Sequence, residues 1–306
     1  MKIKTTMLSW VALLAISVSP SVTAATLFSG LYSFGDSLSD VGNTSLATSG
    51  ALPGAAYYNG RYSNGPVWVE YLASKLGLPA PSPSLIPGGR DYAFAGAYTS
   101  GGGAVPTLVQ QAGMFVSTGS FLPTDLVTVW GGANDFFFSS PVDFTTPAAN
   151  IGTVITTLAA GGAKNILLLN LPDLGDLPET LASGAPAIAV GHNFSVGYNG
   201  LLASMVPSLE ASLGIDIMLL DIFGIGKNTL TNAAALGFTN TTLGALPSGN
   251  AANANEFMYW DGVHPTTRVH TIFADAAYTA VPEASTAMLL WVFGIGLVTR
   301  RNRQAA

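Results

Sequence analysis

The amino-acid sequence predicts one α/β domain in which helices cover both faces of a mainly parallel sheet. Short apolar runs alternate with longer helical patterns along the chain, an order that favours parallel strands joined by crossover helices. No repeat period and no charged linker divide this region. Stretches rich in Gly, Ser and Asn, such as 100–103 and 244–253, are typical of surface loops rather than domain boundaries.

The elements are predicted from their length and composition. Five short runs rich in Val, Ile, Leu or aromatic residues are the predicted strands: Gly30–Phe34, Asp91–Ala95, Leu126–Trp130, Asn165–Asn170 and Ile215–Leu220. The main helices expected around them are Pro66–Leu76, Thr107–Val116, Pro147–Ala160, Val190–Leu213 and Thr266–Tyr278. Pro66 and Pro265 suit helix starts, where a missing N–H costs nothing.

Residues 1–24 have the pattern of a signal peptide. Lys2 and Lys4 precede the largely apolar run 7–18, and small residues lead up to Ala24. Cleavage after Ala24 is expected. The sequence therefore predicts an exported protein whose main domain spans 25–280.

The last segment, 281–306, has a pattern of its own. A Pro-Glu pair at Pro282 is followed by the apolar or Gly run 287–298 and then by an Arg cluster. As a helix, that run is roughly 18 Å long, against a bilayer core of about 30 Å. The order resembles the bacterial PEP-CTERM sorting tail, although Ala284 stands where a second Pro is common. This resemblance implies transient membrane association and a sorting protease; a single weak anchor is the alternative.

Charge and cysteine content exclude several classes of protein. The two ends hold one of the 17 acidic and five of the 11 basic residues, so the region between them carries a net charge of about −10. Nucleic acid and anionic lipid surfaces are therefore improbable partners. The chain has no Cys, which excludes disulfides and Cys-ligated metals.

Polar residues follow the first three predicted strands. Gly35, Asp36 and Ser37 come after the first, Gly96 after the second and 132–135 after the third. In an open parallel sheet these positions share one edge, where ligands collect. Ser37 is a candidate nucleophile there, but a serine is weak at neutral pH and requires a base.

Three histidines are candidates for that base. His192 and His270 lie inside helical patterns without an acidic partner of obvious use, so each is expected to be a surface or packed residue. His264 follows Asp261 on a short loop, where the carboxylate can orient the imidazole. By itself this pair fits a metal ligand, a surface pair or a base. Together with Ser37, it favours a base.

A serine attacking an ester or amide creates an oxyanion, which requires hydrogen-bond donors fixed in advance. The candidate donors are the backbone N–H groups of Ser37 and Gly96 and the side-chain amide of Asn134. Gly96 lacks a Cβ, so a substrate can approach its amide closely.

Other residues near these positions are expected to have structural roles. Asp36, Asp40 and Asp135 should hold turns and loops through backbone hydrogen bonds. Phe136–Phe138 could line an acyl pocket, although packing is the stronger expectation. Trp260 fits either a pocket wall or the core.

Four segments, taken in order, resemble the sequence blocks of the GDSL esterase/lipase family of SGNH hydrolases. They are Phe34–Asn43, Tyr92–Ala97, Gly132–Asp135 and Asp261–Thr266. Segments 170–175 and 237–240 also look like recurrent family segments. Each block alone is a weak signal. Four in the right order, over about residues 30–280, are a specific one.

The resemblance implies a flavodoxin-like three-layer α/β/α sandwich with a mainly parallel five-stranded sheet. It also implies hydrolysis of acyl esters through an acyl-serine intermediate, without a metal or an organic cofactor. The implied site residues are Ser37, Asp261 and His264 as the triad, with Ser37, Gly96 and Asn134 as oxyanion donors. Two positions depart from the family pattern: Asp91 stands where Asn is usual, and Ala95 where Gly is common.

Alternative functions stay open at this point. A deacetylase of exported polysaccharide would use the same site, and a non-catalytic surface or matrix protein could retain the scaffold. Small-molecule, lipid and acylated-polysaccharide esters are all candidate substrates. No Gly-x-Ser-x-Gly elbow and no His-Glu-x-x-His sequence occurs, which disfavours the common α/β-hydrolase and zinc-hydrolase classes.

Overall fold

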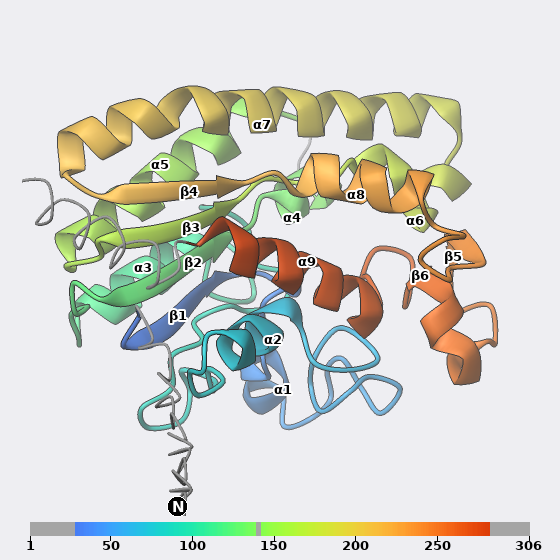
Figure 1. Cartoon of the computed structure of the whole chain (residues 1–306), viewed down its shortest axis with the longest axis horizontal. Coiled ribbons are helices and arrows are strands. Elements are labelled where there is room, and N and C mark those ends of the chain that lie inside the picture. Colours follow the sequence, from blue (N-terminus) through green and yellow to red (C-terminus); the bar gives the residue numbers. More distant parts are fainter. Residues whose placement is uncertain (1–27, 139–141, 282–306) are drawn as a thin grey trace, which may run out of the picture.

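A parallel four-stranded sheet lies at the centre of the molecule (Figure 1). The computed structural model describes residues 28–138 and 142–281; the predicted signal peptide and all but the first residue of the predicted sorting tail lie outside them. The strands, in their order across the sheet, are β1 (Gly30–Gly35), β2 (Asp125–Trp130), β3 (Asn165–Leu169) and β4 (Asp216–Leu220). The predicted α/β class with a parallel sheet is confirmed.

The predicted strand at 91–95 is reduced to a single bridge at the edge of the sheet. Asp91 pairs in parallel with Ser33 of β1, and the Tyr92 and Phe94 N–H groups donate to the Ser33 and Gly35 carbonyls at 2.7 and 3.2 Å. The N–H groups of Ala93 and Ala95 instead donate to the side chains of Asp91 and Asp40. The Gly35 N–H, which would continue the pairing with this segment, donates to the Gln111 side chain, so the ladder stops here. The sheet has four strands plus this bridge, which gives the flavodoxin-like order when the edge segment is counted.

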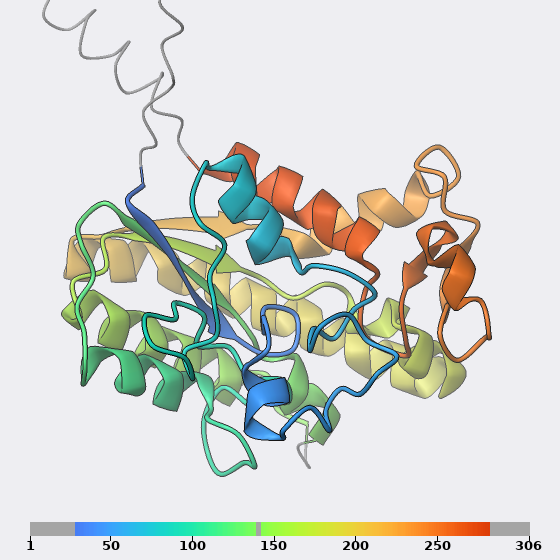
Figure 2. The same ribbon diagram turned by 90° about the horizontal axis from the view of Figure 1, so that it is seen from below.

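Helices cover both faces of the sheet (Figures 1 and 2). On one face lie α3 (Leu108–Val116), α5 (Thr145–Ala160) and α7 (Ala185–Leu213), which contact each other in that order. On the other face α2 (Trp68–Lys75) packs against α9 (Thr267–Ala280). All five predicted helices are present, with shifted ends.

The core between the layers is closely packed. The central strands β2 and β3 are largely apolar and almost wholly buried, as expected for strands that are covered on both faces. Trp130 of β2 joins the sheet to both helices of the second face, because its ring meets Trp68 and Phe273 edge to face at centroid distances of 5.8 and 5.7 Å.

Several short elements complete the chain, and the sequence pattern did not predict them. They are α1 (Asn43–Ala47), α4 (Ala133–Phe138), η1 (Leu174–Asp176), α6 (Pro178–Ala182), α8 (Ile222–Thr231), β5 (Asn240–Gly244), η2 (Ala251–Glu256) and β6 (Phe257–Tyr259). β5 and β6 form a separate two-stranded parallel sheet. Together with α6 and α8, they lie at the carboxyl end of the main sheet (Figure 1).

None of the helices in the described part of the chain is both long enough and apolar enough to cross a bilayer.

The end of β1 is held by a buried side chain from α3. Gln111 accepts a hydrogen bond from the Gly35 N–H at 2.9 Å and donates to the Gly35 carbonyl at 2.8 Å. A Cβ at Gly35 would lie 2.3 Å from the Trp130 carbonyl oxygen, so only glycine fits this approach of β1 to β2. The two constraints fix the point from which the chain turns toward Ser37.

His270 occupies the interior between α9 and α2, as the packed residue that its pattern predicts. The Trp68 N–H donates to its Nδ1 at 3.3 Å, and burial lowers the pKa of the imidazole to about 3. Its Nε2 has no hydrogen-bond partner within 28–138 and 142–281. The folded protein therefore holds this ring neutral where an unfolded chain would protonate it.

The variant His270→Asn should reduce the acid sensitivity of the fold. The unfolded wild type takes up a proton below about pH 6.5 and the folded protein does not, so wild-type stability falls as the pH falls, by about 1.4 kcal/mol per unit. Asn can still accept from the Trp68 N–H but does not titrate. Urea unfolding at about pH 7 and pH 5 should show a wild-type-minus-variant difference that shrinks by about 2 kcal/mol. Parallel pH dependences would contradict this account.

Candidate active site

Ser37 lies at the tip of a turn that follows directly from β1. The Asp36 carbonyl accepts hydrogen bonds from the N–H groups of Ser39 and Asp40, both at 3.0 Å, and the Asp36 side chain accepts from the Leu38 N–H. Asp36 thus holds the turn, as expected. The serine is largely buried but lines a cavity at the carboxyl edge of the sheet.

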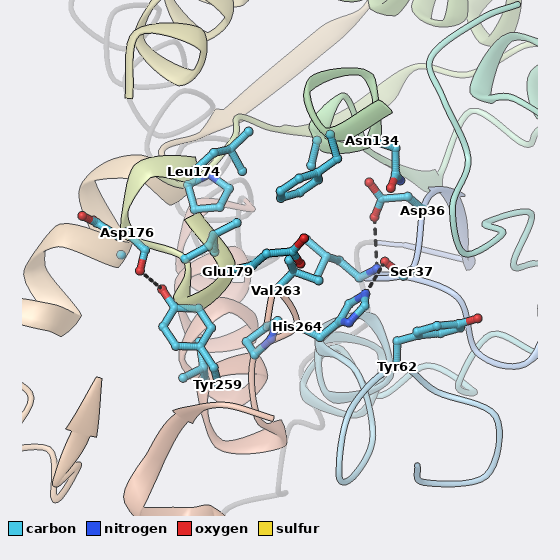
Figure 3. A pocket seen from close by; sticks show the side chains of 18 of the residues that line it. Asp36, Ser37, Tyr62, Asn134, Leu174, Asp176, Glu179, Tyr259, Val263 and His264 are labelled. Atoms are coloured by element: carbon cyan, nitrogen blue, oxygen red, sulfur yellow. Dashed lines mark hydrogen bonds between the residues drawn. The ribbon is translucent and has the colours of Figure 1, made fainter. Parts of the chain in front are cut away.

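His264 and Asp261 reach this serine from the other end of the chain. His264 Nε2 is 2.8 Å from Ser37 Oγ, and His264 Nδ1 is 2.7 Å from Asp261 Oδ2. Figure 3 shows the ring of His264 pointing at Ser37. The structure therefore brings all three predicted residues together in one hydrogen-bonded row.

Asp261 is held as a carboxylate by the groups around it. Burial raises its pKa, but the hydrogen bond and charge of His264 and the backbone N–H groups of His264 and Val263 outweigh burial and lower the pKa to about 2. Both N–H groups donate to Oδ1, at 2.7 and 2.9 Å. The other oxygen, Oδ2, faces His264 Nδ1 and so orients the imidazole.

The loop that carries Asp261 and His264 is closed by its own backbone. The Trp260 N–H donates to the His264 carbonyl at 2.8 Å, and the Thr266 N–H donates to the Met258 carbonyl at 2.9 Å. From the neighbouring segments, the Glu179 N–H donates to the Gly262 carbonyl at 2.9 Å, and Ser63 Oγ donates to that of Pro265. The imidazole is therefore placed by a rigid turn between β6 and α9.

Gly96 and Asn134 line the same cavity as Ser37. Gly96 has φ of +80°, which favours glycine, and a Cβ added there would meet no atom within 4 Å. Asn134 donates one amide hydrogen to the Ala97 carbonyl at 3.0 Å, which leaves the second for another acceptor. Both predicted donors therefore lie at the wall of the cavity that Ser37 lines.

Three aspartates anchor the segments that carry these donors. Asp40 accepts from the Ala95 N–H at 3.0 Å, and Asp135 accepts from both the N–H and the hydroxyl of Thr99. At the position where the family usually has Asn, Asp91 accepts from the Val41 N–H at 2.9 Å. The structural role expected of Asp40 and Asp135 agrees with these contacts.

The carboxyl of Asp36 titrates in an unusual range. Burial raises its pKa to about 6, against the opposing effects of the Leu38 N–H and of His264. This carboxyl lines the cavity next to Ser37. Its charge, which is lost as the pH falls through about 6, adds to the negative potential around the serine.

The cavity has a volume of about 420 Å³, within the range of small-molecule sites. It runs from Ser37 and Asn134 past Leu174 and Val263 toward Tyr259 (Figure 3). Phe137 and Phe138 of α4 line it, whereas the ring of Phe136 packs against Phe194 at 5.4 Å. The Phe136–Phe138 run thus divides between cavity and core. Trp260 is 4% exposed and belongs to a small apolar cluster beside β6.

His192 has an acidic partner, contrary to the sequence interpretation. Its Nδ1 is 2.6 Å from Asp173 Oδ2, which Lys227 also contacts at 2.7 Å. Asp173 lies 19 residues earlier, on the segment after β3, so no local pattern revealed the pair. The imidazole is about half exposed, in keeping with the expected surface position.

Two tyrosines near the Asp261–His264 pair were not predicted from the sequence. Tyr57 donates its hydroxyl to Asp261 Oδ2 at 2.7 Å, and the ring of Tyr62 lies 5.1 Å from the ring of His264. Tyr57 is 204 residues from Asp261 in sequence. The only sequence signal is the cluster of tyrosines in the loop between α1 and α2, which indicates that this loop packs against the domain.

No group of three His, Cys, Asp or Glu side chains that could hold a metal ion is found within 28–138 and 142–281.

Comparison with known proteins identifies the class to which this fold and site belong. Residues 31–277 match the GDSL-like lipase/acylhydrolase family, so the chain belongs to that family. It is 29% identical to a phosphatidylcholine-sterol acyltransferase of Aeromonas hydrophila, over 90% of this chain and 97% of the relative. It is 25% identical to a GDSL esterase/lipase of Arabidopsis thaliana, over 86% and 93%.

Solved structures of related shape include a carbohydrate acetylesterase from Sinorhizobium meliloti. The alignment covers 85% of this chain and 99% of that one, with a TM-score of 0.45 and 17% sequence identity.

The variant Tyr57→Phe should slow ester hydrolysis without unfolding the protein. Losing a hydrogen bond to a charged group should lower kcat/KM about tenfold. With one donor fewer, Asp261 attracts the proton of His264 more strongly, so the acidic limb of the pH–rate profile should move to higher pH. The check is kcat/KM for a p-nitrophenyl ester between about pH 5 and 9. Tyr58→Phe, at the exposed neighbouring ring, is the control, and an unmoved limb in Tyr57→Phe would count against the role.

Proposed function

We propose that the protein is a serine esterase that cleaves carboxylic acyl esters through an acyl-serine intermediate. The observation that carries this proposal is the row of hydrogen bonds from Ser37 through His264 to Asp261, at the wall of a cavity large enough for a small molecule. Membership of the acylhydrolase family supports the same reaction.

In the first half-reaction, Ser37 Oγ attacks the ester carbonyl carbon and His264 Nε2 takes the hydroxyl proton. The new C–O bond places the electron pair of the carbonyl on its oxygen. When the tetrahedral intermediate collapses, the bond to the alcohol oxygen breaks, and the protonated His264 donates its proton to that alcohol. Asp261 balances the charge on the imidazolium throughout.

The second half-reaction releases the acid. His264 removes a proton from a water molecule, which attacks the acyl-serine carbonyl, and the Ser37 oxygen leaves with the proton returned by His264. In both halves, the oxyanion would be stabilised by the N–H groups of Ser37 and Gly96 and by the free amide hydrogen of Asn134. The open space in front of Gly96 supports this assignment.

The ester is that of a lipid or another small acyl compound. The name of the Aeromonas relative, a phosphatidylcholine-sterol acyltransferase, supports acyl chemistry on lipid esters. We also propose that the protein acts outside the bacterial cytoplasm, because residues 1–24 have the pattern of an export signal and 281–306 that of a sorting tail. Mass spectrometry of the mature protein would test both ends.

The variant Ser37→Ala should abolish hydrolysis of p-nitrophenyl butyrate, with kcat at least about 10³-fold lower than wild type. A fluorophosphonate probe should label the wild type at Ser37, as located by peptide mapping, and should not label the variant. Ser39→Ala, two residues along the same turn, is the control and should keep its label. Full activity in Ser37→Ala, with an unchanged circular dichroism spectrum, would overturn the proposed function.

The variant Asn134→Ala should lower kcat for the same ester by about 10²- to 10³-fold and change KM little, because the donor acts on charge that develops in the transition state. Asn193→Ala, an exposed position of α7, is the matched control. Thermal unfolding of both variants separates a loss of donor from a loss of fold. An Asn134→Ala variant with wild-type kcat would remove Asn134 from the oxyanion site.

A further inference from the structure

The cavity beside Ser37 has an open part and an enclosed part. At the open part, Leu52 and Phe138 are 49% and 66% exposed to solvent. At the enclosed part the walls are apolar and at most 6% exposed. They come from β2, η1, β6 and α9 and comprise Trp130, Leu174, Met258, Val269 and Phe273.

The order of events in an acyl-serine reaction indicates which part of the cavity holds the alcohol and which holds the acyl group. The alcohol departs and water enters while the acyl group is still bonded to Ser37. The alcohol side therefore needs access to solvent, and the acyl side does not. The buried apolar walls suit an alkyl chain, which gains free energy by leaving water and makes no hydrogen bonds.

We propose that the enclosed part binds the acyl chain of a fatty acyl ester, and that Gly226 of α8 leaves the space for it. This inference rests on the proposed function and specifies its substrate class. An acetyl group would fill only the region next to Ser37 and leave the buried apolar space empty.

Gly226 lies on the inward face of α8. Ile222, one turn earlier, and Thr229, almost one turn later, are both buried, at 0% and 2% exposure, and Leu230 lines the cavity. A Cβ added at Gly226 would nevertheless meet no atom within 4 Å. A side chain pointing inward from this position thus has empty space in front of it, and the glycine itself lines the cavity.

Polar groups of Thr229 and Lys227, beside this space on α8, are already engaged. Thr229 Oγ1 donates to the Ile225 carbonyl at 2.8 Å, and the Lys227 ammonium contacts the carboxylates of Asp173 and Asp176, both at 2.7 Å. The same ion pairs tie α8 to the segment after β3. An alkyl chain can therefore occupy the space without leaving these groups unpaired, and α8 is held as a fixed wall.

The test uses p-nitrophenyl esters from acetate to decanoate. For the wild type, kcat/KM should rise about fourfold for each added methylene until the space is filled. In Gly226→Leu, the ratio of kcat/KM for octanoate to that for acetate should fall at least ~10-fold, because the new side chain occupies the volume of several methylenes. Gly226→Ala should lower the same ratio by a smaller factor, and this variant replaces Gly226→Leu in the test if the leucine variant does not fold.

Gly200→Leu is the matched control, because Gly200 is also a helix glycine with no atom within 4 Å of its Cβ position but is exposed on α7. Its octanoate-to-acetate ratio should equal that of the wild type. A wild type that hydrolyses acetate at least as well as octanoate, or Gly226 variants with an unchanged ratio, would overturn the acyl-chain assignment and leave the esterase function standing. Absence of hydrolysis for every ester, with Ser37 unlabelled by the fluorophosphonate probe, would overturn both.

Discussion

The hydrogen bond between His264 Nε2 and Ser37 Oγ is the contact on which the rest of the site depends. It joins residues 227 positions apart in the sequence and has a length of 2.8 Å. Each end is fixed independently. Gln111 and the close approach of β1 to β2 hold the serine turn, whereas the closed backbone loop between β6 and α9 holds the histidine. Because an imidazole must lie within hydrogen-bond reach to act as a base, small shifts of either end would be felt at the serine.

Much of the fold and of the triad could be predicted because both depend on strong local signals. The four strands of the sheet are apolar runs that only a covered parallel sheet can bury, and Asp261 and His264 are close in sequence. The segment at 91–95 looked equally strand-like. It forms only a bridge because the Gly35 N–H, which would continue its pairing with β1, donates to the Gln111 side chain, a competition that no apolar pattern reveals.

The parts that sequence patterns missed are short or distant. α4 has six residues, too few for an apolar pattern of helical period to stand out in the sequence. This helix begins one residue before Asn134. Tyr57 and the pairing of His192 with Asp173 depend on how loops pack in three dimensions. Contacts between side chains that are distant in sequence hold the site in place. The local sequence patterns could predict only which residues the site contains.

The loop between α1 and α2 contacts the Asp261–His264 pair and also lines the cavity. Tyr57 and Tyr62 contact the Asp261–His264 pair, while Leu52 of the same loop lines the open part of the cavity. A change in this loop that reshapes the cavity would therefore also act on the contacts of the Asp261–His264 pair. Substrate range and turnover should therefore diverge together among close relatives. Substitutions on α8, which also lines the cavity, offer a way to change substrate range alone.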